Sequence, residues 1–315
     1  MKKGIIIISI LISNILFSQS IYKSSLDSGG ASTAVGNIQI LYTIGEVNVQ
    51  ELSVGNIILS EGFISKQLQL FIKINPISYL QGTYINPNEV GLMNDALRTA
   101  SLIPTTSPYA DLVTAASSVF NLGGTSGLGA IDDDIVDWVW VELRDENDNT
   151  AIIDSQSALL QRDGDIVDVD GVSALNFDQL AGNYYVAIAH RNHLGIITAN
   201  TVSLSSSVTV LDLTSDSNLI LGGGNAVVIV NGKLNLISGD YDGNGQIQNS
   251  DLTQVTTLLG TSGYSDADAD MNSQIQNADI NNIINPNIGN GEQTRSTNQP
   301  IITAPLSAFH KSKKQ

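Results

Sequence analysis

The sequence contains two closely related stretches of twelve residues, DYDGNGQIQNSD at Asp240–Asp251 and DADMNSQIQNAD at Asp268–Asp279. They begin 28 residues apart, and their second halves, QIQNSD and QIQNAD, differ at one position. In each stretch, oxygen-bearing side chains occupy positions 1, 3, 5 and 12, position 7 can offer its backbone carbonyl, and position 9 is Gln. This spacing of oxygen ligands is typical of a calcium-binding loop. The sequence therefore predicts two calcium sites, carried by a chain that otherwise reads as β modules.

The two loops offer the same kinds of ligand in the same order. Gly245, at position 6 of the first loop, allows the sharp turn because glycine adopts a positive φ at little cost. Ser273 takes that position in the second loop, so we expect the second site to be the weaker. The predicted calcium ligands are Asp240, Asp242, Asn244, Gln246, Gln248 and Asp251 in the first loop and Asp268, Asp270, Asn272, Gln274, Gln276 and Asp279 in the second.

The charge around the loops favours a bound cation. Seven Asp, one Glu and no Lys or Arg lie between Lys233 and Arg295. Clustered carboxylates without basic partners repel one another unless a cation neutralises them. The alternative is an acidic pair of loops that only turns the chain.

Each loop is followed by apolar residues at helical spacing, namely Leu252, Val255 and Leu259 after the first and Ile280, Ile283 and Ile284 after the second. Pro286 is expected to end the second helix. The residues before the first loop, 233–239, follow a strand pattern instead of a helix. Loop followed by helix, twice, with Asp rather than Glu at position 12, resembles the dockerin type I module.

The resemblance covers about 50 residues and rests on a specific motif. It implies two calcium ions and a small helical module that can bind a cohesin. It also implies that partner contacts sit at loop positions 10 and 11, which are Asn249 and Ser250 in the first copy and Asn277 and Ala278 in the second. A cohesin-like protein or another cell-envelope protein is therefore the expected partner.

Three segments further upstream carry a second resemblance: VDWVWVELRD at Val136–Asp145, ALLQRDGDIVDVDG at Ala158–Gly171 and YYVAIAHRNHLGIITA at Tyr184–Ala199. They are similar to segments that precede dockerin-like repeats in large secreted proteins of Gram-negative bacteria. The resemblance implies a secreted or cell-surface location and this order of modules, but no reaction.

The chain is expected to be mainly β, with antiparallel β-sandwich modules followed by the small α-helical dockerin-like module. Residues 1–18 read as a signal peptide, because Lys2 and Lys3 precede the apolar stretch Gly4–Phe17. A small β module follows at 19–67, then a β-sandwich-like domain at 68–232, the dockerin-like module at 233–289 and a flexible tail at 290–315. A helix is expected to begin at Asn86–Glu89.

Within the sandwich, the strongest predicted strand is Ile135–Arg144, in which Val139, Val141 and Leu143 alternate with Trp138, Trp140 and Glu142. Short apolar runs separated by turn signals favour an antiparallel sandwich. The other predicted strands are Leu68–Ile74, Ser157–Gln161, Asp165–Val169, Tyr184–His190, Gly195–Ala199, Val208–Leu213 and Ala226–Val230.

The composition excludes several classes of function. The 315 residues carry a formal net charge of −17, which makes nucleic acid and anionic membrane surfaces poor partners. There is no cysteine, so thiol catalysis and disulfides are excluded. No segment after the signal peptide is long and apolar enough to span a membrane. No catalytic constellation is found, including the nucleophile elbow G-x-S-x-G, so the chain is not expected to be an enzyme.

Three further groups of residues have a structural and a functional interpretation. Asp163, Asp165, Asp168 and Asp170 could form a third calcium site, but Asp163-Gly164 favours the turn of a hairpin. For His190 and His193, polar positions at a strand end are favoured over a metal site. Core packing is favoured over sugar stacking for Trp138 and Trp140.

These observations predict a non-enzymatic, exported calcium-binding protein. The dockerin-like module would rigidify the C-terminal part of the chain or dock to a cell-surface partner. The alternative is a carbohydrate-binding or polysaccharide-degrading accessory protein with the sandwich as its active part and a glycan as its ligand.

Overall fold

The computed structural model describes residues 29–35, 38–44, 50–54, 57–61, 71–123, 130–293, 305–307 and 310. The chain divides into two compact units, Met1–Gln69 and Leu70–Gln315. The predicted boundary between the sandwich and the dockerin-like module, at 232/233, therefore falls inside one compact unit. The predicted signal peptide at 1–18 lies outside the described residues.

The first unit contains two antiparallel hairpins. One joins β1 (Gly29–Val35) to β2 (Ile38–Ile44), and the other joins β3 (Gln50–Val54) to β4 (Ile57–Glu61). All four strands fall within the stretch expected to form a small β module.

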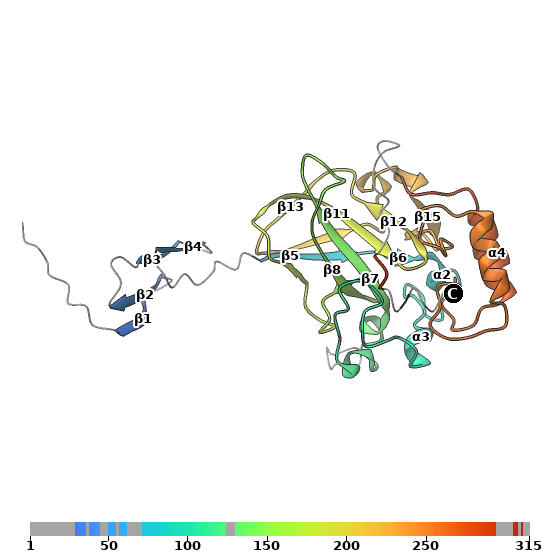
Figure 1. The fold of residues 1–315 in the computed structure, drawn as a ribbon, viewed down its shortest axis with the longest axis horizontal. Helices are drawn as coiled ribbons and strands as arrows, with labels where there is room; N and C mark the ends of the chain where they lie inside the picture. The colour runs from blue at the N-terminus through green and yellow to red at the C-terminus, as the bar shows by residue number, and fades with distance from the viewer. Residues whose placement is uncertain are drawn as a thin grey trace, which may run out of the picture. The chain divides into compact units, whose positions relative to one another are not determined.

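An antiparallel sheet of six strands forms the centre of the second unit (Figure 1). Its strand order is β12-β11-β7-β8-β9, and β13 pairs with the other end of β11. The strands are β7 (Ile135–Arg144), β8 (Ile152–Gln161), β9 (Ile166–Val167), β11 (Gly182–His190), β12 (His193–Ile197) and β13 (Val202–Leu204). The bounds predicted for β7 are confirmed, and all ten of its residues are buried, so both faces of this central strand are covered.

Two three-stranded sheets flank the central sheet. The first has the order β10 (Leu175–Phe177), β5 (Ile72–Ile77), β14 (Val208–Asp212), and the second has the order β15 (Val227–Val230), β16 (Lys233–Leu236), β6 (Tyr79–Leu80). β14 runs parallel to β5, and β16 runs parallel to β6. The prediction of a mainly β fold with antiparallel sheets is therefore confirmed, but it is wrong for these two pairs. Each pair joins strands far apart in the sequence, and the local pattern of residues carries no signal of such pairing.

The helices in the described part of the chain are few and short. Besides α2 (Gln81–Tyr84) and α3 (Ala96–Thr99), they are α4 (Asn249–Thr257), the π-helix η5 (Asp279–Ile284) and α5 (Asn285–Asn287). Single 3₁₀ turns lie at η1 (Ser117–Phe120), η2 (Ile131–Asp133), η3 (Ser217–Leu219) and η4 (Gly223–Asn225). Within the part of the chain that the structure describes, no helix is long and apolar enough to cross a membrane.

The prediction that a helix begins at Asn86–Glu89 is wrong, because the helix α3 begins only at Ala96. Asn94 accounts for the difference. Its side-chain Nδ2 donates to the carbonyl of Asn86 at 2.8 Å, and its Oδ1 accepts from the backbone N–H of Asn88 at 2.8 Å. Such bonds from a side chain to the backbone compete with helical ones and favour a turn.

The second helix ends at Asn287, one residue after the Pro286 that was expected to end it. The helical path continues through α5, in which Pro286 occupies one of the first two positions. Helical backbone runs without a break from Asn277 to Asn287, so α5, with Pro286, is the last turn of this helix. The π-helix η5 directly precedes it.

One further hairpin and one contact of the C-terminal tail complete the fold. Leu160 pairs with Ile166 across a turn in which Gly164 has a φ of 96°, which confirms the predicted Asp163-Gly164 hairpin. In the tail, Leu306 is buried and bridges Tyr109. The prediction of a flexible tail over 290–315 did not include this contact.

Candidate metal centres

The first loop gathers three carboxylates around one point. Oxygen atoms of Asp240, Asp242 and Asp251 all lie within 4.8 Å of one another. The two oxygens of Asp240 accept the backbone N–H groups of Asn244 at 3.0 Å and of Gly245 at 2.9 Å. The chain thus wraps around a buried carboxylate at position 1.

The carboxylate at position 12 closes the first loop. Asp251 accepts the N–H of Gln248 at 2.8 Å and that of Asp242 at 3.2 Å. Gln248 is the N-cap of α4 and Asp251 is its third residue, and together they form a capping box. The predicted site residue Asp251 therefore lies in the first turn of α4.

The second loop repeats this arrangement 28 residues later. Oxygens of Asp268, Asp270 and Asp279 lie within 4.8 Å of one another. Asp268 accepts the N–H of Asn272 at 3.0 Å and that of Ser273 at 2.7 Å. Asp279 accepts three N–H groups, from Gln276 at 2.7 Å, Ala269 at 2.8 Å and Asp270 at 3.1 Å. No other cluster of three or more His, Asp or Glu ligand groups occurs in the described residues, so the third site considered at 163–170 is not found.

Asparagine and glutamine at positions 5, 7 and 9 behave alike in both loops. The Oδ1 atoms of Asn244 and Asn272 each accept the N–H two residues later, both at 2.9 Å. The exposed side chains at positions 7 and 9 hydrogen bond to each other, Gln246 with Gln248 and Gln274 with Gln276. Their roles as ligands stay predictions.

Left-handed backbone distinguishes the two loops. The first has glycine at both positions of positive φ, Gly243 at 72° and Gly245 at 79°. The second places Met271 at 57° and Ser273 at 78° in the same two positions. A side chain in this conformation costs roughly 1–2 kcal/mol per residue. The strain at Met271 was not anticipated from the sequence, and it adds to the reason for a weaker second site.

Electrostatics gives both loops the properties of a cation site. Burial, together with Asp251 and Asp242, raises the pKa of Asp240 to about 7. Burial and Asp270 raise the pKa of Asp268 to about 8. None of the ion pairs among the described residues includes a loop carboxylate. Carboxylate oxygens are hard ligands, and three of them gathered without an ion pair in the described residues fit a divalent cation such as calcium.

The predicted partner-binding positions lie at the surface. Asn249, Ser250 and Asn277 are exposed, and Ala278 is half-buried. Asn249 and Ser250 are the first two residues of α4, so a rigid helix presents them. Their role in docking stays a prediction.

A buried polar joint, which the sequence did not reveal, connects the second loop to the central sheet. Arg191, between β11 and β12, donates from Nε to Asp137 at 2.9 Å and from Nη1 to Asp266 at 3.1 Å. Its guanidinium also lies 4.3 Å from the ring centre of Tyr264, whose hydroxyl donates to Asp137 at 2.7 Å. Burial alone would raise the pKa of Asp137, but Arg191 and His190 outweigh it and hold that pKa below its usual range.

Asn192 ties the same turn to the loop itself. Its side-chain Nδ2 donates to the carbonyls of Asp266 and Asp268, both at 3.0 Å. His190 and His193 lie at the end of β11 and the start of β12, as the strand-end interpretation predicts. Both rings are buried, with each Nδ1 close to Asn192 Oδ1.

Helix α2 also packs against the second loop. A Cβ atom on Gly82 would lie 1.9 Å from the carbonyl oxygen of Ala269, so the two backbones touch. Ser238 donates its hydroxyl to the same oxygen at 3.0 Å. The Oε1 of Gln81 accepts the Ser238 N–H at 3.0 Å and the amide of Asn287 at 2.7 Å. The second loop is therefore built into the β domain.

The two tryptophans are core residues. Trp138 is 0% exposed and donates to the carbonyl of Pro104 at 2.8 Å, and Trp140 is 6% exposed and donates to Glu142 at 3.0 Å. Core packing is therefore confirmed. The alternative of sugar stacking at Trp138 and Trp140 is wrong, because neither ring face reaches solvent.

No family model matches the sequence, and no curated protein matches it. Two solved structures are similar, both of a type II cohesin–X-dockerin complex from Acetivibrio cellulolyticus. An N-terminal interface mutant matches over 59% of this chain and 95% of the other at 18% identity and a TM-score of 0.31. A C-terminal interface mutant matches over 70% and 97% at 17% identity and a TM-score of 0.33.

Proposed function

We propose that this chain is a non-enzymatic, exported protein that binds two calcium ions and uses them to order a C-terminal docking module. The observation that supports it best is a pattern of hydrogen bonds that repeats 28 residues apart. In each copy the pattern surrounds three carboxylates, and none of them forms an ion pair within the described residues. The carboxylates at positions 1, 3 and 12 would hold each ion, helped by oxygens at positions 5, 7 and 9.

Ordering follows from charge. In the metal-free protein, Asp240 and Asp268 resist ionisation because burial and neighbouring carboxylates disfavour the anion. Bound calcium supplies the positive charge that lets these groups ionise together. Because the unfolded chain has no formed site, the binding free energy adds to the stability of the folded module.

Docking is the second half of the proposal. The exposed Asn249, Ser250 and Asn277, with Ala278, would present polar, uncharged contacts to a cohesin-like or other cell-envelope protein. A secreted or cell-surface location supplies millimolar calcium, which suits loops of modest affinity.

Calcium titration of the purified protein tests the first half. We expect calorimetry to show two sites, and we expect calcium to raise the midpoint of thermal unfolding and the protease resistance of residues 236–289. Asp240→Ala should remove one site. A titration with no heat and no change in the unfolding midpoint would sink the proposal.

Capture from a cell-envelope fraction, with calcium and with a chelator, tests the second half. A partner that binds only in calcium, and that is lost on Ser250→Arg, supports docking through the first helix. If Ser250→Arg still binds both calcium and the partner, then this surface is not the docking surface.

A further inference from the structure

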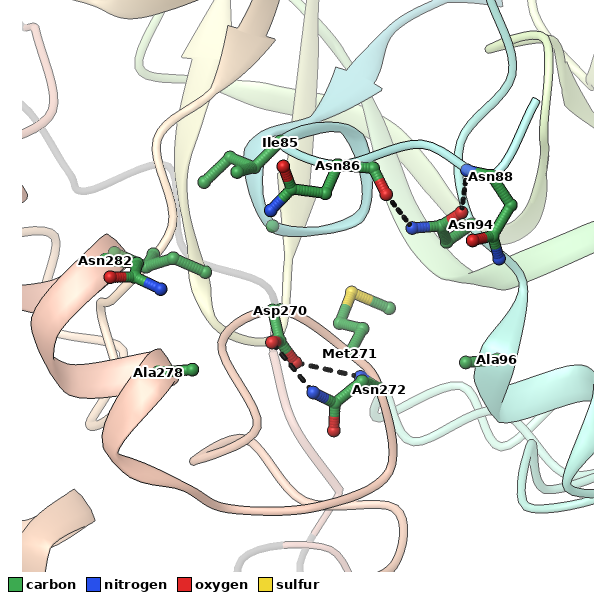
Figure 2. A pocket seen from close by; sticks show the side chains of 12 residues that line it. Ile85, Asn86, Asn88, Asn94, Ala96, Asp270, Met271, Asn272, Ala278 and Asn282 are labelled. Atoms are coloured by element: carbon green, nitrogen blue, oxygen red, sulfur yellow. Dashed lines mark hydrogen bonds between the residues drawn. The ribbon is translucent and has the colours of Figure 1, made fainter. Parts of the chain in front are cut away.

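A cavity of about 280 Å³ lies between the second loop and the turn that joins α2 to α3 (Figure 2). Asp270, Asn272 and Asn282 line it from the loop and the helix that follows. Asn86, Asn88 and Asn94 line it from the turn. Five amide side chains therefore converge on one small space, and they come from segments far apart in the sequence.

Two of these amides hold the walls in place. Asn94 bridges the turn through its bonds to the backbone of Asn86 and Asn88, both at 2.8 Å. Asn272 donates to Oδ2 of Asp270 at 2.8 Å, which fixes the wall formed by the loop. Figure 2 shows both sets of bonds on opposite sides of the cavity.

The remaining three amides are available to a ligand. Asn86, Asn88 and Asn282 are exposed, and their side chains make no hydrogen bond to another residue in the described part of the chain. The side chains of Asn86 and Asn282 extend into the space between the turn and the helix (Figure 2). Each amide offers two donors and one acceptor, a combination that matches neighbouring hydroxyl groups, which also donate and accept.

The charge and size of the cavity restrict the ligand. No Lys, Arg or His lines the cavity, and Asp270 is its one charged residue, so an anionic ligand is disfavoured. Ile85, Met271 and Ile283 add apolar surface beside the amides. The volume lies at the lower limit of small-molecule sites, which is roughly 300 Å³. A pit of this size admits one ring, whereas an extended peptide needs a groove or a strand edge.

We propose that this cavity binds one ring of a neutral sugar, with Asn86, Asn88 and Asn282 hydrogen bonding to its hydroxyl groups. The inference rests on the proposed calcium function in one respect. Asp270 and Asn272 belong to both the second loop and the cavity wall, so the wall is ordered only when the loop is. Sugar and calcium should therefore each increase the affinity for the other.

The test uses the full chain with saturating calcium and a set of neutral sugars: glucose, galactose, mannose and N-acetylglucosamine. Ligand-observed NMR and calorimetry should show binding of at least one of them, with a dissociation constant on the order of 1 mM. Glucuronate, the anionic counterpart of glucose, should not bind. Asn86→Ala and Asn282→Ala should each weaken the sugar about tenfold and leave both calcium sites intact.

Gln254→Ala is the matched control, because Gln254 is the counterpart of Asn282 in the first copy, 28 residues earlier, and does not line the cavity. It should leave sugar binding unchanged. The proposal is overturned if no neutral sugar binds the calcium-loaded protein at tens of millimolar, or if both asparagine variants bind sugar normally. In either case the calcium titration still tests the two proposed calcium sites, independently of the sugar proposal.

Discussion

The first and second loops share their ligand positions, their hydrogen bonds and their left-handed turns, yet they differ in their surroundings. The first loop has glycine wherever φ is positive, and the Asn192 bonds do not reach it. The second loop carries two strained residues, and Gly82, Asn192 and Ser238 hold it against the β domain. Local sequence thus sets the shape of each loop, while the strained second loop also makes close contacts with Gly82, Asn192 and Ser238 of the β domain.

Removing the closing carboxylate should have the largest effect. Asp279→Ala leaves three backbone N–H groups without their acceptor, whereas Asp251→Ala leaves two. Because each buried N–H left unpaired costs about 1–3 kcal/mol, we expect Asp279→Ala to destabilise the calcium-bound protein by roughly 3 kcal/mol or more. Denaturant unfolding should show a smaller loss for Asp251→Ala, and calorimetry should show one calcium site in each variant.

Asp279→Asn and Asp251→Asn are the matched controls, because they keep an acceptor oxygen and remove the charge. They should lose the metal site while they keep most of the metal-free stability. Equal losses for alanine and asparagine at position 279 would show that the backbone bonds contribute little.

Gly82→Ala tests the contact that only the second loop makes. The added Cβ would overlap the Ala269 carbonyl, so the second loop must shift. Overpacking of this kind costs about 1–3 kcal/mol, and we expect the second calcium site to weaken while the first is unchanged. Gly224→Ala, where a Cβ meets nothing within 4 Å, should change neither site. A Gly82→Ala protein with two normal sites would show that α2 does not support the loop.

The features of this chain that its sequence predicts are local and periodic. The bounds of β7 follow from an alternating apolar run, and the two clusters of carboxylates follow from ligand spacing within twelve residues. A helix was expected from the apolar residues after Asp251, whereas α4 begins at Asn249, inside the loop, because Asp251 both closes the loop and completes the capping box.

The polar joint could not be found in this way. Asp137, Arg191 and Tyr264 come from three distant segments, and each is an ordinary polar residue in its own neighbourhood. The close approach of Gly82 to Ala269 could not be predicted either, because the sequence around a glycine does not indicate which distant backbone segment packs against it. Asn94, which favours a turn over a helix at residues 86–89, acts through side-chain bonds to Asn86 and Asn88, and these bonds form only once the chain has folded back on itself.

Lowering the pH should separate the two sites by their charge. Calcium requires ionised carboxylates, and the pKa is about 8 for Asp268 and about 7 for Asp240. Each pH unit below a pKa lowers the fraction ionised about tenfold, so at pH 6 the second site should lose about tenfold more affinity than the first. Calcium titrations at pH 6 and pH 8.5 measure this, and parallel losses at both sites would contradict it.

The same shifts predict an opposite trend without calcium. In the folded protein the pKa of both groups is raised above the ordinary pKa of an aspartate, which is about 3.9, so folding favours their protonated forms. Their contribution to stability is fully present below about pH 4 and is lost as the pH rises through 7 to 8. The unfolding midpoint in a chelator should therefore fall between pH 5 and pH 8, and calcium should reverse the fall.

The smallest expected effect comes from exchanging the residues at position 6. Ser273→Gly removes a left-handed strain of roughly 1–2 kcal/mol and adds unfolded-state entropy worth roughly 0.5–1 kcal/mol, so the net gain should be about 0.5–1 kcal/mol. Gly245→Ser should cost the first loop a similar amount, and the N–H bond to the position-1 carboxylate is kept in both exchanges. Calcium affinity measured site by site should then rise at the second loop and fall at the first, which brings the two closer together. If Ser273→Gly leaves the second site as weak as before, its weakness does not come from position 6, and Met271→Gly becomes the exchange that separates strain at position 4 from the contacts with the β domain.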